Sequence, residues 1–305
     1  TWGGNQYAWT SPVIIGLGAA GVVCWGLFAL AQKRAADPIL PWSILTNRTF
    51  VVATVVGMLA MGGMIGVMGY LPTYLQMVYG YSATVSGLLL VPMTIGMLLA
   101  SILSGVLVAR NDRYRVYPVL GALIAAAGVF WLFRLTTASP AWQASAAIFV
   151  MGAGIGLFFQ LLVTVVQNAV PARHLGTATS GNNFFREVAV SLGVSLIGAA
   201  FSSNLTSGLA DRIGALVAGS DPAVRAALAR FADADTSSLT PALVNQMPAV
   251  LHDAVAGAYA DALLPIFGWM IPLFVLTSII ALLLPEVPLS RKTGMEQVAE
   301  AGGDQ

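Results

Sequence analysis

Residues 50–76 read FVVATVVGMLAMGGMIGVMGYLPTYLQ, and no side chain in this stretch carries a charge. An α-helix rises about 1.5 Å per residue, so roughly 20 apolar residues cross the hydrocarbon core of a bilayer, which is about 30 Å thick. The apolar side chains fall on all sides of such a helix and do not alternate with polar ones, as they would in a barrel strand. The stretch therefore predicts a membrane-spanning α-helix.

Six further stretches have the same length and apolar character. With Phe50–Gln76 they make seven predicted spans, the others being Val13–Ala31, Ala83–Val108, Val116–Leu135, Trp142–Gln167, Gly176–Phe201 and Leu263–Leu284. We therefore predict an all-α integral membrane protein that lies in a cell membrane (the plasma or inner membrane) and contacts the lipid bilayer.

The composition excludes several other classes of protein. Of the 305 residues, 57% are hydrophobic and 9% are charged, and the mean hydropathy is +0.81. Soluble domains carry about 25% charged residues, so water is not the main solvent of this chain. A net charge of +1 gives no basic footprint for nucleic acid. The single cysteine, Cys24, forms no intramolecular disulfide, and no Cys/His cluster has metal-ligand spacing, so we expect no metal site.

Basic side chains concentrate in alternate connections between the spans. They are Lys33, Arg34, Arg48, Arg110, Arg113, Arg115, Arg173, Arg291 and Lys292, whereas the connections 1–12, 77–82 and 136–141 contain no Lys or Arg. The positive-inside rule places the basic connections and the C-terminus in the cytoplasm. The long connection 202–262 then lies outside, and Leu205–Val217 and Ala223–Ala232 within it have the apolar spacing of surface helices.

Glycine and proline are frequent inside the predicted spans. Gly62 and Gly66 are four residues apart, as are Gly152 and Gly156, so each pair lies on one helix face and allows a neighbouring helix to approach closely. Such a face serves either fixed packing or a contact that slides during a conformational change. Proline interrupts two spans, at Pro72 and Pro92, where kinks often shape a cavity.

Among the acidic residues, only Glu187 lies inside a predicted span, and with the adjacent Arg186 it forms a charged pair about ten residues into the sixth span, at a depth of about 15 Å. A charge at such depth costs about 2.5–3.5 kcal/mol, so it faces the protein interior or water. Adjacent residues point about 100° apart and do not pair with each other. Two interpretations stay open: the pair lines a cavity, or it clamps the helix to a loop or to a backbone carbonyl.

Uncharged polar and aromatic side chains accompany this pair. We predict a substrate cavity lined by Arg186 and Glu187 together with Asn182, Asn183, Gln160, Tyr70, Tyr74 and Gln76. An apolar, aromatic cavity with a few hydrogen-bonding groups suits bulky amphipathic ligands. The alternative is that the Tyr and Gln side chains serve as hydrogen bonds between helices.

Two blocks of the sequence resemble a known family. The block PTYLQ…GYS…GLLLVP within residues 72–92 and the block QNAVP…LGTATSGNNFFRE within 167–187 resemble the second half of multidrug exporters of the major facilitator superfamily, of the fourteen-helix EmrB/QacA drug:proton antiporter type. TWGGNQYAWTSP at 1–12 resembles the external loop before the second linker helix of these exporters. LPEVPL at 284–289 resembles their exit to a cytoplasmic tail.

The resemblance implies a C-terminal six-helix bundle preceded by one linker transmembrane helix. The regions are 1–32 (external loop and linker helix), 33–49 (cytoplasmic loop), 50–201 (second to sixth transmembrane helices), 202–262 (long external loop), 263–284 (last transmembrane helix) and 285–305 (cytoplasmic tail). It also implies a missing N-terminal six-helix half as partner, which in the family holds the proton-coupling carboxylate. The chain begins at Thr1 without an initiator Met, which favours a start within a longer polypeptide.

A loop motif of the superfamily, G-x-L-a-D-R-x-G-R-[RK], is partly present after the third predicted span. Gly105, Leu107, Arg110 and Arg113 match it, and we predict Gly105, Arg110 and Arg113 as gating-loop residues. Ala109 stands at the motif's Asp position and Asp112 at its second Gly position. This departure weakens the gating role of the loop, because an intact carboxylate there would link the gate to a neighbouring helix.

The resemblance predicts a proton-coupled exporter of amphipathic drugs or other small molecules, with the proton gradient as energy source and no cofactor. A membrane enzyme would need convergent nucleophile, base or metal ligands, which Arg186 and Glu187 alone do not supply. A transporter of another solute or of lipid, and an inactive truncated or scaffold membrane protein, remain open alternatives.

Overall fold

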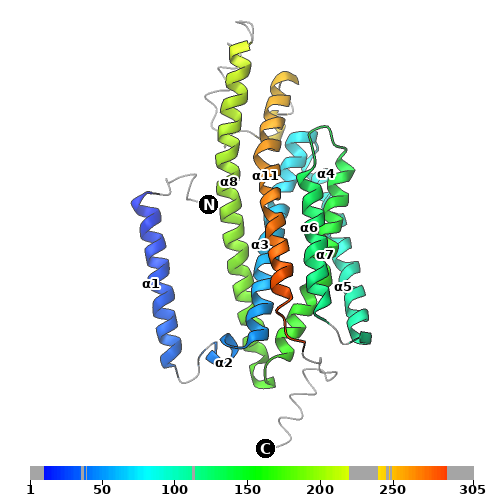
Figure 1. Ribbon diagram of the computed structural model, residues 1–305. Helices are drawn as coiled ribbons and strands as arrows, with labels where there is room; N and C mark the ends of the chain where they lie inside the picture. The colour runs from blue at the N-terminus through cyan, green and yellow to red at the C-terminus, as the bar shows by residue number, and fades with distance from the viewer. Residues whose placement is uncertain are drawn as a thin grey trace, which may run out of the picture.

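The computed structural model describes residues 10–35, 38, 40–111, 114–219, 240–244, 247 and 249–286. Within these residues, seven helical segments are long and apolar enough to cross a membrane. The predicted fold class is therefore confirmed: the described part of the chain is all α-helix, with the spans in the predicted order (Figure 1).

The long helices are α1 (Pro12–Arg34), α3 (Arg48–Tyr79), α5 (Val91–Asn111), α6 (Val116–Phe133), α7 (Ala141–Asn168), α8 (Leu175–Gly219) and α11 (Ala249–Ala281). The short elements are α2 (Trp42–Leu45), α4 (Ala83–Leu88), the 3₁₀ turn η1 (Ala172–His174) and α10 (Pro241–Val244). Several helices have the end signals that the sequence provides. Asn47 caps α3, because its side-chain Oδ1 accepts from the backbone N–H of Thr49 at 2.9 Å. Gly80 ends α3 with a φ of 67°, which glycine adopts without strain.

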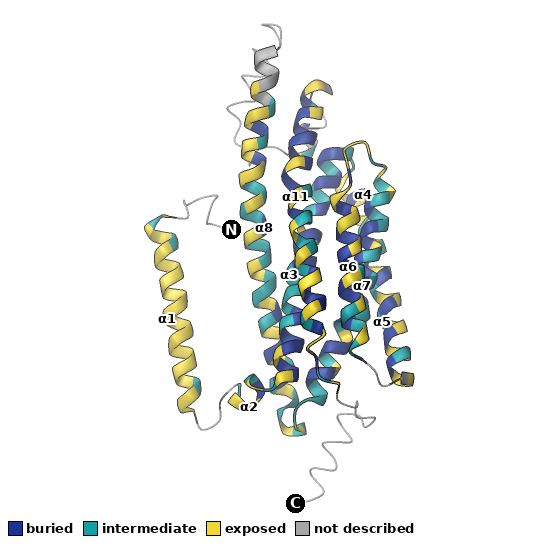
Figure 2. Cartoon of the chain, viewed as in Figure 1, coloured by how far each residue is buried: buried dark blue, intermediate teal, exposed yellow. Residues whose placement is uncertain are grey.

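Six of the long helices form one bundle, and α1 stands beside it (Figure 1). In the bundle, α7 packs against both α5 and α6, α3 packs against α8 and α11, and α11 closes the ring by packing against α6 and α8. Figure 2 shows that α1 is exposed along its whole length, whereas the bundle helices have a buried side. The exposed apolar surface of the bundle and of α1 is the surface that lipid or a further protein segment would cover.

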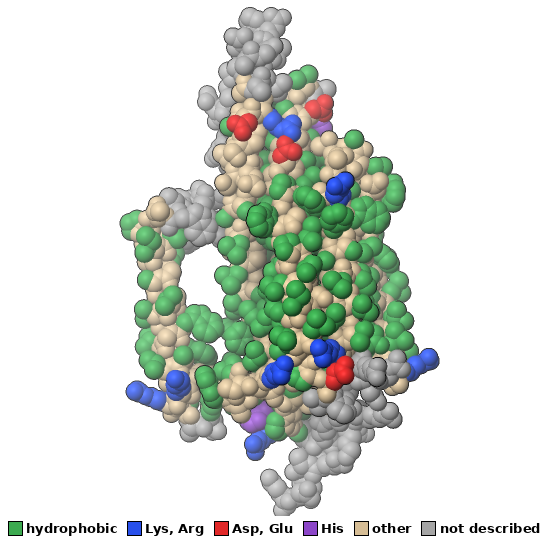
Figure 3. Space-filling model, in the orientation of Figure 1, with side chains coloured by type: hydrophobic (Ala, Val, Ile, Leu, Met, Phe, Trp, Pro, Cys, Tyr) green, Lys and Arg blue, Asp and Glu red, His purple; other side chains and the backbone are tan. Residues whose placement is uncertain are grey.

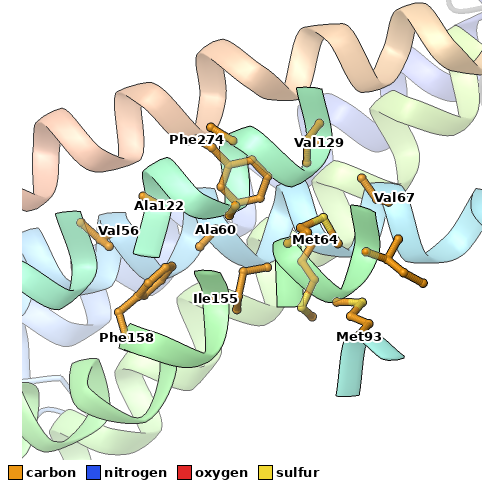
Figure 4. Close-up of a cluster of buried hydrophobic side chains, with 14 of the residues drawn as sticks. Val56, Ala60, Met64, Val67, Met93, Ala122, Val129, Ile155, Phe158 and Phe274 are labelled. Atoms are coloured by element: carbon orange, nitrogen blue, oxygen red, sulfur yellow. The ribbon is translucent and has the colours of Figure 1, made fainter. Parts of the chain in front are cut away.

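The bundle core is a continuous apolar cluster. Figure 4 shows Val56, Ala60, Met64 and Val67 of α3 meeting side chains of the other helices, among them Phe158 of α7 and Phe274 of α11. Small residues alternate with large ones in this cluster, so the helices interlock closely.

The third predicted span, Ala83–Val108, consists of two helices instead of one. Helix α4 ends at Leu88 and α5 begins at Val91. The break has a direct cause: Pro92 has no N–H to donate to the carbonyl of Leu88, and its ring would clash with that carbonyl in a continuous helix. Pro92 therefore lies in the first turn of α5, where proline is well tolerated, and does not kink the middle of a helix. Pro72, in contrast, lies inside the continuous helix α3.

Helices α8 and α11 extend well beyond the spans predicted for them. At about 1.5 Å per residue, the 45 residues of α8 reach about 68 Å, more than twice the hydrocarbon thickness. The extension is held by a second apolar cluster in which Leu205 and Leu209 of α8 contact Val255 and Tyr259 of α11. Leu205–Val217 is thus helical as a continuation of α8, because this packing stabilises it, and Ala223–Ala232 lies outside the described residues.

An ion pair fastens this extension. Arg212 of α8 binds Asp261 of α11, and its Nε donates to Asp261 Oδ2 at 3.2 Å. The guanidinium passes over Gly257, one turn earlier on α11, where a Cβ would collide with it. The exposed position of the pair limits its stabilisation to about 1 kcal/mol or less. Its role is to hold the two extended helices side by side.

The glycine pairs predicted from the sequence do lie at close helix contacts. Gly62 faces the backbone of Ala189 on α8, and a Cβ on Gly193 would lie 2.8 Å from the carbonyl oxygen of Gly62. Gly152 and Gly156 face the α5 backbone at Met93 and Met97. Gly66, in contrast, faces the side chain of Ile197 on α8, and these close contacts are compatible with both fixed packing and a sliding contact.

Replacing Gly156 with alanine is expected to lower the stability of the purified protein by about 1–3 kcal/mol, because the Met97 backbone cannot move away from the added Cβ. Thermal unfolding in detergent measures this change. The matched control is Gly69→Ala on α3, where a Cβ meets no atom within 4 Å. There the higher helix propensity of alanine should leave stability equal or slightly raised. Equal loss in both variants would contradict the close-contact argument.

Charged side chains lie at the two ends of the bundle, and hydrophobic ones cover the band between them on the face shown in Figure 3. One basic residue departs from the predicted asymmetry. Helix α6 ends at Phe133, so the exposed Arg134 belongs to the connection after it and lies at the end opposite to Arg110. This position lies inside the predicted span Val116–Leu135, so the basic residue on the opposite side was not predicted.

Candidate functional site

Helix α8 presents two different polar edges. Asn182 and Arg186 are buried, whereas Asn183 and Glu187 are exposed. Each pair is four residues apart and therefore lies on one face, and the two faces are about 100° apart. The structure thus separates the neighbouring charges Arg186 and Glu187, as their adjacency in the sequence predicts.

Arg186 lies between α3 and α7. The residue is 8% exposed, and its Cδ lies 3.2 Å from the position of a Cβ on Gly57 of α3. Its guanidinium carbon is 4.1 Å from the centre of the Phe159 ring of α7, a distance typical of a cation–π contact. A glycine at position 57 makes room for the aliphatic stem, so the charge reaches the ring.

Arg186 forms no ion pair with a described residue, although the charge of the adjacent Glu187 attracts it electrostatically. Its Nε is buried without a hydrogen-bond acceptor, and no carboxylate oxygen of the described residues lies within ion-pair distance. A buried cation of this kind is destabilising unless a partner or water compensates it. The clamp interpretation, which requires a loop partner or a backbone carbonyl, therefore lacks that partner in the described part of the chain.

Asn182 continues this buried polar edge one turn earlier. Its Nδ2 donates to Thr54 Oγ1 of α3 at 2.9 Å, and its Oδ1 is buried without a partner. Thr54, Asn182 and Arg186 therefore form a polar layer between α3 and α8 that is only partly satisfied. Unsatisfied polar groups in a buried layer are frequent at functional sites.

The exposed edge of α8 lies beside that layer. It combines Asn183 and Glu187 with the aromatic Phe184, which is 47% exposed. On α7, Gln160 is exposed and directly follows Phe159, the ring below Arg186. We call these exposed side chains of the two helices the open amphipathic face: Gln160, Asn183, Phe184 and Glu187.

The predicted candidates on α3 lie elsewhere. Tyr74 is fully buried and packs edge-on against Tyr79 at 6.0 Å between ring centres. The Tyr70 hydroxyl lies against Gly198, and its ring is 5.2 Å from that of Phe201. Both tyrosines and Gln76 are more than three turns along α3 from Gly57, about 20 Å or more away. The structure does not bring Tyr70, Tyr74 and Gln76 together with Arg186, and for the tyrosines it favours packing between helices.

The gating-loop candidates are only partly described. Gly105 and Arg110 are exposed, and a Cβ on Gly105 would meet no atom within 4 Å, whereas Arg113 lies outside the described residues. Tyr114, which the sequence did not single out, is 1% exposed and donates its hydroxyl proton to the carbonyl of Pro285, just after α11. No sequence signal links positions 114 and 285, because they are far apart along the chain.

Seven membrane-length apolar helices around a partly satisfied buried polar layer define a polytopic α-helical membrane protein. Comparison with family models agrees with this class: residues 1–194 match the model of the Major Facilitator Superfamily. The chain belongs to this superfamily.

Several curated proteins are similar to the chain. An uncharacterised MFS-type transporter of Mycobacterium tuberculosis strain H37Rv is 37% identical over 290 residues, which cover 95% of this chain and 40% of the relative. The multidrug transporter protein MdtP of Bacillus subtilis is 28% identical over 310 residues, covering 97% of this chain and 57% of the relative. A tetracycline resistance determinant of Streptomyces rimosus is 26% identical over 195 residues, which cover 64% of this chain and 56% of the relative. The chain thus spans only about 40–57% of the length of these relatives.

Proposed function

We propose that this chain is the C-terminal six-helix bundle, with a preceding linker helix, of a proton-coupled exporter of amphipathic small molecules of the fourteen-helix EmrB/QacA type. The open amphipathic face carries this proposal, because it presents hydrogen-bonding, aromatic and acidic side chains at the depth of the bilayer. The sequence blocks at 72–92 and 167–187 support the fourteen-helix type and the second-half position. The similarity to the multidrug transporter protein MdtP supports export of drugs.

In this proposal the bundle supplies one wall of a cavity, and an N-terminal six-helix half supplies the other. Alternating access then arises when the two bundles rock about a site near the middle of the membrane. Apolar and aromatic side chains of the wall contact the body of the substrate, and Gln160 and Asn183 offer hydrogen bonds. Glu187 adds a negative charge that attracts cationic groups of a substrate.

The proton gradient is the proposed energy source. Protons that enter down their gradient favour the inward-facing state, which accepts the drug from the cytoplasm. They can shift the equilibrium between the two states only because they bind one state more tightly than the other. The proposed orientation has the basic ends of α1, α5 and η1 and the C-terminus in the cytoplasm.

An uncoupler experiment tests the proposal. In inverted membrane vesicles that contain the intact transporter, a protonophore is expected to abolish the uptake of a fluorescent amphipathic cation, even when ATP is present. The control uses vesicles from the same cells without the transporter. Uptake that requires ATP and survives the protonophore would contradict proton coupling, and no uptake with an imposed proton gradient would contradict export itself.

A further inference from the structure

A cavity of about 780 Å³ lies between α1 and the first turns of α8, the helices at the left of the bundle in Figure 1. Its volume is within the range of about 300–1,000 Å³ that is typical of ligand pockets. It is separate from the buried layer at Arg186, although Phe184 belongs to its wall. The lining residues are Cys24, Trp25, Phe28, Leu40, Gly176, Thr177, Ser180, Gly181 and Phe184.

The walls of this cavity are apolar and aromatic. Trp25 and Phe28 come from α1, and Phe184 comes from α8. The rings of Trp25 and Phe184 are 6.0 Å apart between their centres and connect the two helices across the cavity. Since α1 has no buried residue, these contacts leave most of its apolar surface uncovered. An apolar chain in the cavity would cover part of that surface.

Basic residues follow or precede the lining residues closely in the sequence on both sides at one end of the cavity, although Lys33 Nζ lies 5.9 Å from the centre of the Trp42 ring and Arg173 Nε donates to His174 Nε2 at 3.1 Å. On α1, Lys33 and Arg34 follow Phe28 by little more than one turn, and both are exposed. On the other side, Arg173 of η1 comes three residues before Gly176, which lines the cavity. Among the described residues, no Asp or Glu lies in 10–35, 40–50 or 170–180, and Asp37 lies outside the described residues. The charge at this end therefore favours an anion.

Gln32 adds an uncompensated polar group next to the basic end. It lies one turn after Phe28 on α1. Its side-chain Nε2 and Oε1 are buried and form no hydrogen bond with any described residue. An ester or phosphate oxygen placed between the cavity and the basic end would accept a hydrogen bond from Nε2.

We propose that this cavity binds an anionic phospholipid, with an acyl chain between α1 and α8 and the headgroup phosphate beside Lys33, Arg34 and Arg173. An apolar cavity that ends in cations at the membrane surface matches the chemistry of such a lipid, and each cation near the surface contributes about fivefold in affinity. The cavity shares Phe184 with the open amphipathic face, but lipid binding at Trp25 is measured without transport, so its failure is distinguishable from a failure of proton-coupled export.

Quenching of Trp25 fluorescence tests this site. The intact transporter is placed in phosphatidylcholine nanodiscs that contain increasing fractions of phosphatidylglycerol with brominated acyl chains, since bromine quenches a tryptophan only in contact. The Trp25 signal is the difference between wild type and Trp25→Phe. A second titration uses phosphatidylcholine with the same brominated chains. Half-maximal quenching by brominated phosphatidylglycerol is expected at a mole fraction at least tenfold lower than half-maximal quenching by brominated phosphatidylcholine.

Charge variants separate a specific site from general lipid contact. Lys33→Gln combined with Arg34→Gln is expected to reduce the headgroup preference about tenfold or more, because two cations are removed. The matched control, Arg115→Gln with Arg134→Gln, removes two cations elsewhere and should keep the preference. Equal quenching by both lipids would show annular lipid only and overturn the proposal. Absence of Trp25 quenching would mean that another protein segment fills the cavity, and it would also overturn the proposal. Recovery of Trp25 fluorescence on addition of a transported compound would overturn it as well, because the cavity would then bind substrate.

Discussion

Replacing Arg186 with methionine is expected to lower efflux by the intact transporter at least tenfold while its apparent melting temperature stays equal to or above that of wild type. The charge of Arg186 is buried without an ion pair to a described residue, so it costs free energy in the folded state, about 2.5–3.5 kcal/mol on the membrane insertion scale. Methionine keeps an unbranched stem over Gly57 and a favourable sulfur contact with the Phe159 ring. This result would show that stability does not require the charge, and the loss of efflux would assign the charge a role in transport.

Two measurements make this test decisive: efflux of a fluorescent substrate from whole cells, and thermal unfolding of the purified transporter. The matched control is Arg186→Lys, which keeps the charge but loses the planar guanidinium over Phe159, and is expected to retain part of the efflux. Full efflux by Arg186→Met would remove the charge from the mechanism. Loss of folded Arg186→Met protein would instead favour the structural-clamp interpretation.

The sequence predicted the helices of this fold well, because one physical rule decides them. A stretch of about 20 apolar residues has to be helical in lipid to satisfy its backbone, so hydropathy alone identified Phe50–Gln76 and six further spans. The packing of the Gly152 and Gly156 face followed from helical spacing in the same way.

The ends of the helices were predicted less well, because hydropathy identifies the segment that lies in the hydrocarbon core, and a helix can continue beyond that segment. Helix α8 continues past Phe201 because Leu205 and Leu209 pack against α11, a tertiary contact that no local pattern contains. The division between α4 and α5 has a local cause in the sequence, because Pro92 lacks the N–H that would bond to the preceding turn.

The candidate site was predicted in part. The depth and adjacency of Arg186 and Glu187 identified an unusual pair and predicted that they face different ways. The partners Gly57, Phe159 and Thr54 were missed, because they lie on other helices and look like ordinary apolar or small residues of a span. A polar residue type alone also does not tell an interhelical contact from a cavity wall, which is why Tyr74 was grouped with the site although it is fully buried.

Replacing Glu187 with glutamine is expected to raise the apparent KM for a cationic amphipathic substrate at least tenfold and to change the KM for a neutral one less than threefold. Glu187 is exposed and lies on the open amphipathic face, and it forms no ion pair with a described residue. Its charge is therefore available to a substrate. Two unit charges about 4 Å apart attract by about 4 kcal/mol at an effective dielectric constant of 20, and about 1.4 kcal/mol is sufficient for a tenfold effect.

Glutamine has nearly the shape of glutamate, so the amount of folded transporter and its melting temperature should stay at wild-type values, as is usual for exposed positions. The matched control is Asp211→Asn, which removes an exposed carboxylate from the same helix far from the open face and should leave both KM values unchanged. Equal losses for the cationic and the neutral substrate would contradict attraction of the substrate by Glu187 and would fit a group that carries the coupled proton. Unchanged transport of both substrates would exclude Glu187 from the substrate path, because a lone carboxylate at this depth of the cavity wall cannot be electrostatically silent toward a cation that passes it.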